Sequence, residues 1–175
     1  MDGSIKDNSH INKLEFKVNK LCVLECEKYI LRKQGIKYND DILTEETITK
    51  KWYIRNGRHF SVIGKHLKKF GFTIKRKRKA SIEYLIHSLN NGNDVIVAVD
   101  GGELFDGDSI EEVLEDIYIG EIADHTVVVE SYDANNDNIC IFDPNNQEML
   151  QSVPLCNFIN AWLDSKCYLV EIIHP

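Results

Sequence analysis

The sequence predicts an α+β fold, with helices in the first half of the chain and an antiparallel sheet in the second. Two observations support this expectation. Apolar residues recur at helical spacing as far as Gly92, and short β-branched runs separated by turn residues follow. The runs do not alternate with helices in the regular way of a βαβ protein. A chain of 175 residues fits one domain, expected over residues 13–175 after a polar tail at 1–12.

Four helices are expected before the sheet. Apolar residues repeat on one helical face in residues 22–35 and 58–71, and a glycine ends each segment. On the helix expected at 58–71, His59 and His66 should lie on the solvent side. A shorter helix is expected over residues 44–54, and Ser81 should cap a fourth that ends at Gly92.

The strands are expected after Gly92. Residues 94–100 form a β-branched run between turn residues, which indicates a buried strand. Two further runs flank the turn sequence "ANND" and therefore predict a hairpin of strands 125–133 and 138–143. The remaining expected elements are a loop at 101–109, a short helix at 109–118, a third strand at 148–153, a helix at 154–164 and a closing strand at 167–173.

Composition excludes several classes of protein. No apolar stretch approaches the roughly 18 residues of a membrane span, and the polar N-terminus "MDGSIKDNSHINKLEFK" lacks the apolar segment of a secretory signal. These features predict a cytoplasmic location and no membrane partner. The five cysteines, an odd number, show neither a disulfide framework nor zinc-site spacing. We therefore expect no metal and no cofactor.

Charge is divided unevenly along the chain. Residues 1–79 carry 20 Lys or Arg and 9 acids, whereas residues 80–165 carry 18 acids and no Lys or Arg. Within the first part, residues 50–79 hold 12 basic residues and no acid. Either the two parts neutralise each other, which we favour, or residues 50–79 bind an anionic partner. Nucleic acid is not the expected partner, because this segment lacks aromatic interleaving and a known motif.

Three residues suggest thiol–imidazole chemistry. Cys22 opens the first expected helix, where free N–H groups and the helix dipole favour a negative charge. His125 opens one hairpin strand and Asp143, before Pro144, ends the other, so the two should lie near each other. The alternatives are a small buried cysteine, an exposed histidine at a strand end and a turn-forming aspartate. Local sequence cannot bring Cys22 to the other two.

The order of these elements resembles the papain-like bacterial cysteine peptidases of the C39 group, and most closely the stand-alone members without a transporter. The matching stretches are "LCVLECEKYILRKQGI", "FSVIGKHLKKFGF", "NDVIVAVDGGELF", "EDIYIGEIADHTVVVESYD", "CIFDPNN" and "FINAWLDSKCYLVEI". The resemblance implies a papain-like fold and a peptide or protein substrate. It also implies Cys22 as nucleophile, His125 as general base and acid, and Asp143 as the residue that orients the imidazole.

One position departs from the family pattern. The family has a glutamine about six residues before the cysteine that stabilises the oxyanion, and Phe16 stands there in this chain. Asn19 could donate in its place, with the backbone N–H of Cys22 as partner. Losing one such donor costs about 10²–10³ in rate. The alternatives to a peptidase are a catalytically impaired module that binds peptides or regulates, and an acyltransferase that uses the same Cys–His pair.

Overall fold

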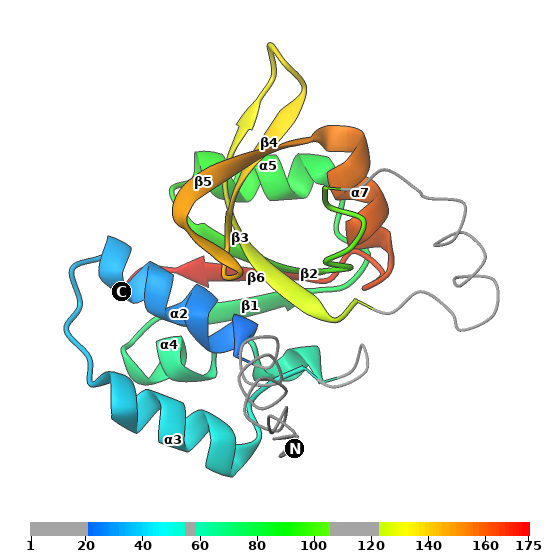
Figure 1. Ribbon diagram of the computed structural model, residues 1–175. Helices are drawn as coiled ribbons and strands as arrows, with labels where there is room; N and C mark the ends of the chain where they lie inside the picture. The colour runs from blue at the N-terminus through cyan, green and yellow to red at the C-terminus, as the bar shows by residue number, and fades with distance from the viewer. Residues whose placement is uncertain (1–20, 55–58, 106–122) are drawn as a thin grey trace, which may run out of the picture.

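The computed structural model describes residues 21–54, 59–105 and 123–175, and Figure 1 shows their arrangement. Six antiparallel strands form one sheet in the order β1-β6-β2-β3-β4-β5. The strands are β1 (Thr73–Lys77), β2 (Asp94–Val99), β3 (His125–Asp133), β4 (Asn138–Asp143), β5 (Asn146–Pro154) and β6 (Leu169–Ile173). The helices are α2 (Cys22–Lys33), α3 (Asp40–Lys50), the 3-10 turn η1 (Phe60–Val62), α4 (Lys65–Lys69), α5 (Ile82–Asn90) and α7 (Leu155–Leu163). The predicted α+β class is confirmed.

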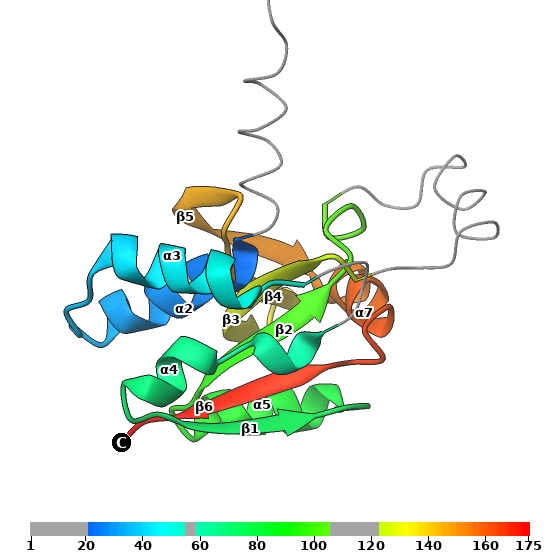
Figure 2. The same ribbon diagram turned by 90° about the horizontal axis from the view of Figure 1, so that it is seen from below.

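Helices cover both faces of the sheet. Helices α2, α3 and α4 lie on one side, and α5 and α7 lie on the other, as the two views in Figures 1 and 2 show. Strand β2 runs between these layers and is buried along its whole length. Its side chains alternate, so that Ile96 joins the core under α2 and Val97 joins the core under α5 and α7. A strand buried on both faces explains the continuous apolar run in the sequence.

The C-terminal elements agree closely with the expectation from sequence. The hairpin of β3 and β4 has the predicted bounds and the predicted four-residue turn. Helix α7 places Phe158 and Trp162 in the core, and the Trp162 indole donates to the backbone oxygen of Tyr168 at 3.0 Å. The helix expected at 109–118 and the polar tail at 1–12 lie outside the described residues.

The helix expected at 44–54 is shifted toward the N-terminus. Helix α3 begins at Asp40, because the Asn39 side chain accepts a hydrogen bond from the Ile42 N–H and two acids occupy the first turn. It ends at Lys50, where Lys51 adopts a left-handed conformation. The predicted start at Thr44 is therefore four residues too late, because Asn39 provides the stronger cap.

The prediction of a single helix over residues 58–71 is wrong. Gly64, with φ of +87°, separates η1 from α4, and a Cβ at this position would lie 2.9 Å from Ile74 Cγ2. His66 is not on the solvent side: its side chain is buried, with Nε2 2.7 Å from the Thr47 hydroxyl. Strand β1 follows directly and pairs with β6, although its basic sequence was not recognised as a strand.

Candidate active site

The predicted catalytic residues meet at one edge of the sheet. His125 opens β3 opposite Val99, the last residue of β2. Asp143 ends the adjacent strand β4. Helix α2 packs on β3, and the buried Cys26 thiol donates to the Thr126 backbone oxygen at 3.4 Å. This contact holds the first turn of α2, which begins at Cys22, against the start of β3.

His125 and Asp143 form a buried pair. Nε2 of the imidazole lies 2.7 Å from Asp143 Oδ1, and both side chains are almost completely inaccessible to solvent. The same carboxylate oxygen accepts a hydrogen bond from the Asn145 N–H at 2.8 Å. The carboxylate is therefore fixed by the turn that follows β4, and it fixes the imidazole in turn.

The Cys22 thiol interacts with the same imidazole. Cys22 is close enough to contribute, together with Asp143, to the raised pKa of His125. Because Nε2 faces Asp143, Nδ1 is the nitrogen left for a second partner. The structure thus places all three residues selected from sequence in one neighbourhood. This arrangement can both remove a proton from sulfur and return one to a leaving group.

The electrostatics of the site favour a charged imidazole. Burial by itself would lower the pKa of His125, but the hydrogen bonds to Asp143 and Cys22 outweigh burial and raise that pKa to about 10. Burial would raise the pKa of Asp143, yet the hydrogen bond and charge of His125 hold it below its usual value. At neutral pH the pair is therefore an imidazolium and a carboxylate.

Cys22 is buried, as Cys26 is, so burial alone does not distinguish it from the other cysteines. Burial raises the pKa of Cys26 well above its usual value, and burial also raises the pKa values of Cys140 and Cys167. Cys156 is exposed on α7 and hydrogen-bonds its neighbour Asn157. Within the described residues, Cys22 is the cysteine that contributes to the raised pKa of His125, the histidine paired with Asp143.

The first turn of α2 begins at Cys22. Leu21 occupies the N-cap position, and its side chain makes no capping hydrogen bond. The N–H groups at the start of a helix favour negative charge, so this position suits a thiolate on Cys22. Asn19 and Phe16 lie outside the described residues, so the role suggested for Asn19 stays a prediction.

Two positions that the sequence analysis did not select support the site. Gly101, in the loop after β2, lies so close that an added Cβ would be 3.3 Å from the His125 Cβ. Glu27, on α2 one turn and a half after Cys22, is buried and accepts hydrogen bonds from the N–H groups of Gly64, His66 and Leu67. A charged residue on the apolar face of the first helix was the signal for Glu27. Gly101 had no signal, because its importance depends on a tertiary contact.

The basic segment 50–79 is spread over several elements in the part of it that the structure describes. Lys50 and Lys69 both pair with Glu46, and Arg76 donates to the backbone oxygens of Ser61 and Ile63. These contacts lie within the first half of the chain. Whether the segment binds an anionic partner stays a prediction.

In the part of the chain that the structure describes, no helix is both long enough and apolar enough to cross a membrane. Likewise, no three His, Cys, Asp or Glu side chains in the described part of the chain are grouped so that they could hold a metal ion.

Comparisons with known proteins were made for the sequence and for the structure. A model of the Peptidase_C39 like family matches residues 5–170. A crystal structure from Bacillus anthracis described as C39-like has 21% identity and a TM-score of 0.50; the match covers 70% of this chain and 60% of that one. The N-terminal peptidase C39 like domain of a toxin secretion ATP-binding protein from Vibrio parahaemolyticus has 13% identity and a TM-score of 0.47. That match covers 91% of this chain and 96% of the Vibrio chain. A search of curated proteins found no match.

Proposed function

This chain belongs to the Peptidase_C39 like family, and we propose that it is a cysteine peptidase that cleaves a peptide or amide bond through an acyl-thioester on Cys22. The observation that carries the proposal is the His125 ring, which Asp143 holds at 2.7 Å and whose pKa the nearby Cys22 helps to raise. The family makes a peptide substrate the natural expectation. Because the chain spans 60% of the length of the Bacillus anthracis protein, nothing more specific is carried over from that protein.

In the proposed first step, His125 holds the proton of the Cys22 thiol, and the resulting thiolate attacks the carbonyl carbon of the scissile bond. A carbon–sulfur bond forms, and the electron pair of the carbonyl double bond moves to oxygen. The imidazolium then gives its proton to the leaving nitrogen as the carbon–nitrogen bond breaks. The amine product departs, and the acyl group remains on Cys22 as a thioester.

In the second step, neutral His125 takes a proton from water as the water oxygen attacks the thioester carbonyl. The carbon–sulfur bond breaks, the carboxylic acid product leaves, and the thiolate–imidazolium pair is restored. Asp143 keeps Nδ1 directed at the sulfur and stabilises the positive ring in both steps. An amine in place of water would give acyl transfer with the same residues.

Both steps pass through an oxyanion that needs donors. We propose the backbone N–H of Cys22 as one donor, since the start of α2 has no side-chain cap. We propose the Asn19 amide as the second. All five cysteines are free, which agrees with a reducing compartment and supports the expected cytoplasmic setting.

The test is cleavage of a library of internally quenched peptides, with products identified by mass spectrometry. We expect the wild type and Cys156→Ala to cleave the same peptides, and Cys22→Ala to cleave none. Products with a free carboxylic acid at the new terminus indicate hydrolysis, whereas products with an amide to an added amine indicate acyl transfer. Cleavage that survives in Cys22→Ala would refute the proposal, and a wild type that cleaves no peptide would refute a peptidase function.

A further inference from the structure

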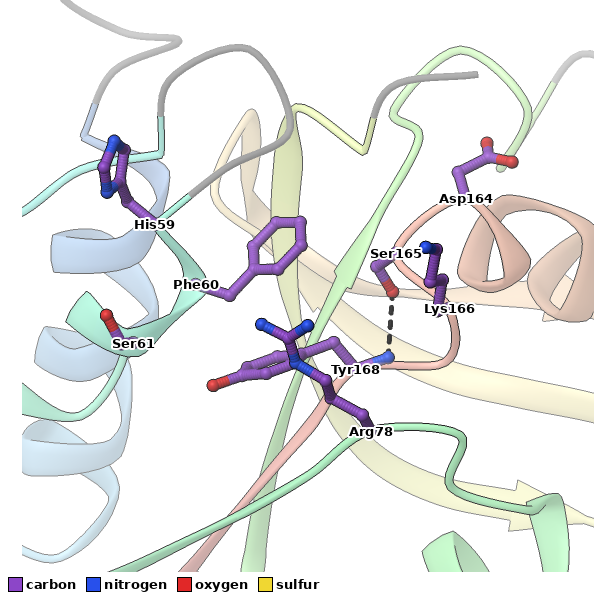
Figure 3. A pocket seen from close by; sticks show the side chains of 8 residues that line it. All are labelled: His59, Phe60, Ser61, Arg78, Asp164, Ser165, Lys166 and Tyr168. Atoms are coloured by element: carbon purple, nitrogen blue, oxygen red, sulfur yellow. Dashed lines mark hydrogen bonds between the residues drawn. The ribbon is translucent and has the colours of Figure 1, made fainter. Parts of the chain in front are cut away.

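A pocket lies at the same edge of the sheet as the candidate active site, by the end of β1 and the start of β6. Figure 3 shows the side chains that line it. Its volume is about 440 Å³. The lining side chains come from three places: the segment around η1, the end of β1 and the turn before β6. They are His59, Phe60, Ser61, Arg78, Asp164, Ser165, Lys166 and Tyr168.

The sheet fixes the distance from this pocket to the active site. The Tyr168 backbone oxygen accepts from the Ala98 N–H, and Ala98 in turn is paired with Thr126, the neighbour of His125. Tyr168 is thus two strands away from the start of β3, which corresponds to about 10 Å. An extended peptide advances about 3.3 Å per residue, so a substrate side chain roughly three residues from the scissile bond could reach the pocket.

The pocket has an aromatic floor. The ring centroids of Phe60 and Tyr168 are 5.1 Å apart, and both residues pack on the core cluster that contains Cys22. The Arg78 guanidinium carbon lies 5.9 Å from the centre of the Tyr168 ring. Figure 3 shows the guanidinium directed toward the two rings. Arg78 is exposed, so an anion can reach its guanidinium from solvent, while the ring of Tyr168 limits the directions in which the side chain can point.

Backbone hydrogen bonds build the cationic side of the pocket before any ligand is present. The Lys79 N–H donates to the Lys166 backbone oxygen at 2.8 Å, which brings Arg78 and Lys166 to neighbouring positions. The Ser165 hydroxyl accepts from the Tyr168 N–H at 2.9 Å and donates to the Trp162 backbone oxygen at 2.9 Å. The turn that carries Lys166 is therefore fixed at both ends.

Positive charge prevails in this pocket. Arg78, Lys166 and His59 supply basic groups, while Asp164 supplies a single carboxylate. In Figure 3 the Asp164 carboxylate lies at the opposite end of the pocket from the Arg78 guanidinium. The chain as a whole has a formal net charge of −7, so this local excess of positive charge is contrary to the overall balance.

From these features we propose that the pocket is a specificity subsite that receives an acidic side chain of the peptide substrate. Arg78 binds the carboxylate through its planar pair of N–H groups, Lys166 adds a second positive charge, and the Phe60 and Tyr168 rings contact the aliphatic part of the side chain. The inference rests on the proposed peptidase function, because it assigns a preference to the same site.

The experiment compares pairs of internally quenched peptides that differ only by Glu or Gln at one position, scanned over four positions on each side of a cleaved bond. For the wild type we expect one position, about three residues from the bond, at which Glu raises kcat/KM roughly five- to tenfold over Gln. Arg78→Gln should remove that preference, and Arg78→Glu should replace it with a preference for Lys. Lys68→Gln, an exposed lysine on α4 with the same change in charge, is the matched control and should keep the wild-type preference.

The outcomes separate the two proposals. If the wild type cleaves peptides but Glu and Gln are equivalent at all scanned positions, the subsite is refuted and the peptidase function stands. The subsite is also refuted if Arg78→Glu still prefers Glu over Gln. It is refuted as well if the control Lys68→Gln loses the Glu preference to the same extent as Arg78→Gln. If the wild type cleaves no peptide of the library, the peptidase function itself fails, and the subsite fails with it.

Discussion

Replacing Asp143 by Asn tests how the carboxylate controls the imidazole. The Asp143 oxygen lies 2.7 Å from His125 Nε2, and this hydrogen bond is a main reason why the pKa of His125 is raised to about 10. An Asn oxygen at the same place can still accept from Nε2–H, so the ring keeps its orientation, but the negative charge is gone. An opposite charge at this distance shifts a pKa by about 1–3.

The expected effect has a definite sign. A base whose pKa is raised stays protonated to higher pH, so the wild type should keep the imidazolium, and the ability to protonate the leaving nitrogen, up to about pH 10. In Asp143→Asn the loss of the charge should move the basic limb of kcat/KM down by roughly one to three pH units. Activity near pH 7 should fall less than in Asp143→Ala, which loses the orientation as well.

The assay is a pH profile of kcat/KM for one cleaved peptide, measured for the wild type, Asp143→Asn and Asp143→Ala. Thermal unfolding of each variant controls for loss of fold. A basic limb that stays at the wild-type position in Asp143→Asn would refute the reasoning, because it would mean that the carboxylate does not hold the proton on His125.

Three further predictions concern the surroundings of the site. Burial raises the pKa of Glu27 to about 7, although three backbone N–H donors act in the opposite direction. The stability that the protonated Glu27 side chain contributes should therefore be fully present below about pH 4.5 and lost as pH rises through 7. Urea unfolding at about pH 5 and about pH 8 should show this loss of stability in the wild type and not in Glu27→Gln. Gly101→Ala places a methyl group 3.3 Å from the His125 Cβ and should displace the imidazole. We expect kcat/KM to fall about tenfold or more. Peptide cleavage measures this loss, and thermal unfolding of the same variant should show little change in stability. Trp162→Ala removes a buried indole and its hydrogen bond to the Tyr168 oxygen, and should lower the free energy of unfolding by about 3–5 kcal/mol.

The sequence was most informative where short-range patterns determine structure. The hairpin of β3 and β4 follows from two apolar runs around a four-residue turn, and its bounds agree with the prediction. The proximity of His125 and Asp143 follows from the same pairing, because residues at the open end of a hairpin are neighbours. Ser81 caps α5 as expected, since its hydroxyl accepts from the Tyr84 N–H.

The sequence was least informative where structure depends on contacts between distant segments. The helix expected at 58–71 is interrupted at Gly64, whose N–H is bound by the Glu27 carboxylate from another helix. His66 is buried because Thr47 of α3 lies against it, which no pattern within its own segment indicates. Strand β1 was hidden by its lysines and arginines, which an edge strand can carry at little cost.

The contact between Cys22 and His125 belongs to the same class. The two residues are far apart in sequence, and local patterns give no reason for them to meet. Their approach depends on the packing of α2 against β3, to which the hydrogen bond from the Cys26 thiol to Thr126 contributes. Local patterns could therefore predict the fold class and the His125–Asp143 pair, whereas Cys22 was joined to that pair only by the family resemblance.

The most direct test of the central claim is the rate at which iodoacetamide alkylates Cys22, measured by mass spectrometry from pH 5 to pH 9 in the wild type and in His125→Ala. Cys156, which is exposed and far along the chain on α7, serves as the internal reference in each sample. Cys22 is buried and Cys156 is exposed, so the two rates are compared only as a ratio within each sample. An imidazolium beside the sulfur favours the thiolate, so we expect the ratio of the Cys22 rate to the Cys156 rate at pH 6 to be higher in the wild type than in His125→Ala. Equal alkylation of Cys22 in the two proteins at pH 6 would contradict the account, because it would show that His125 does not activate the thiol.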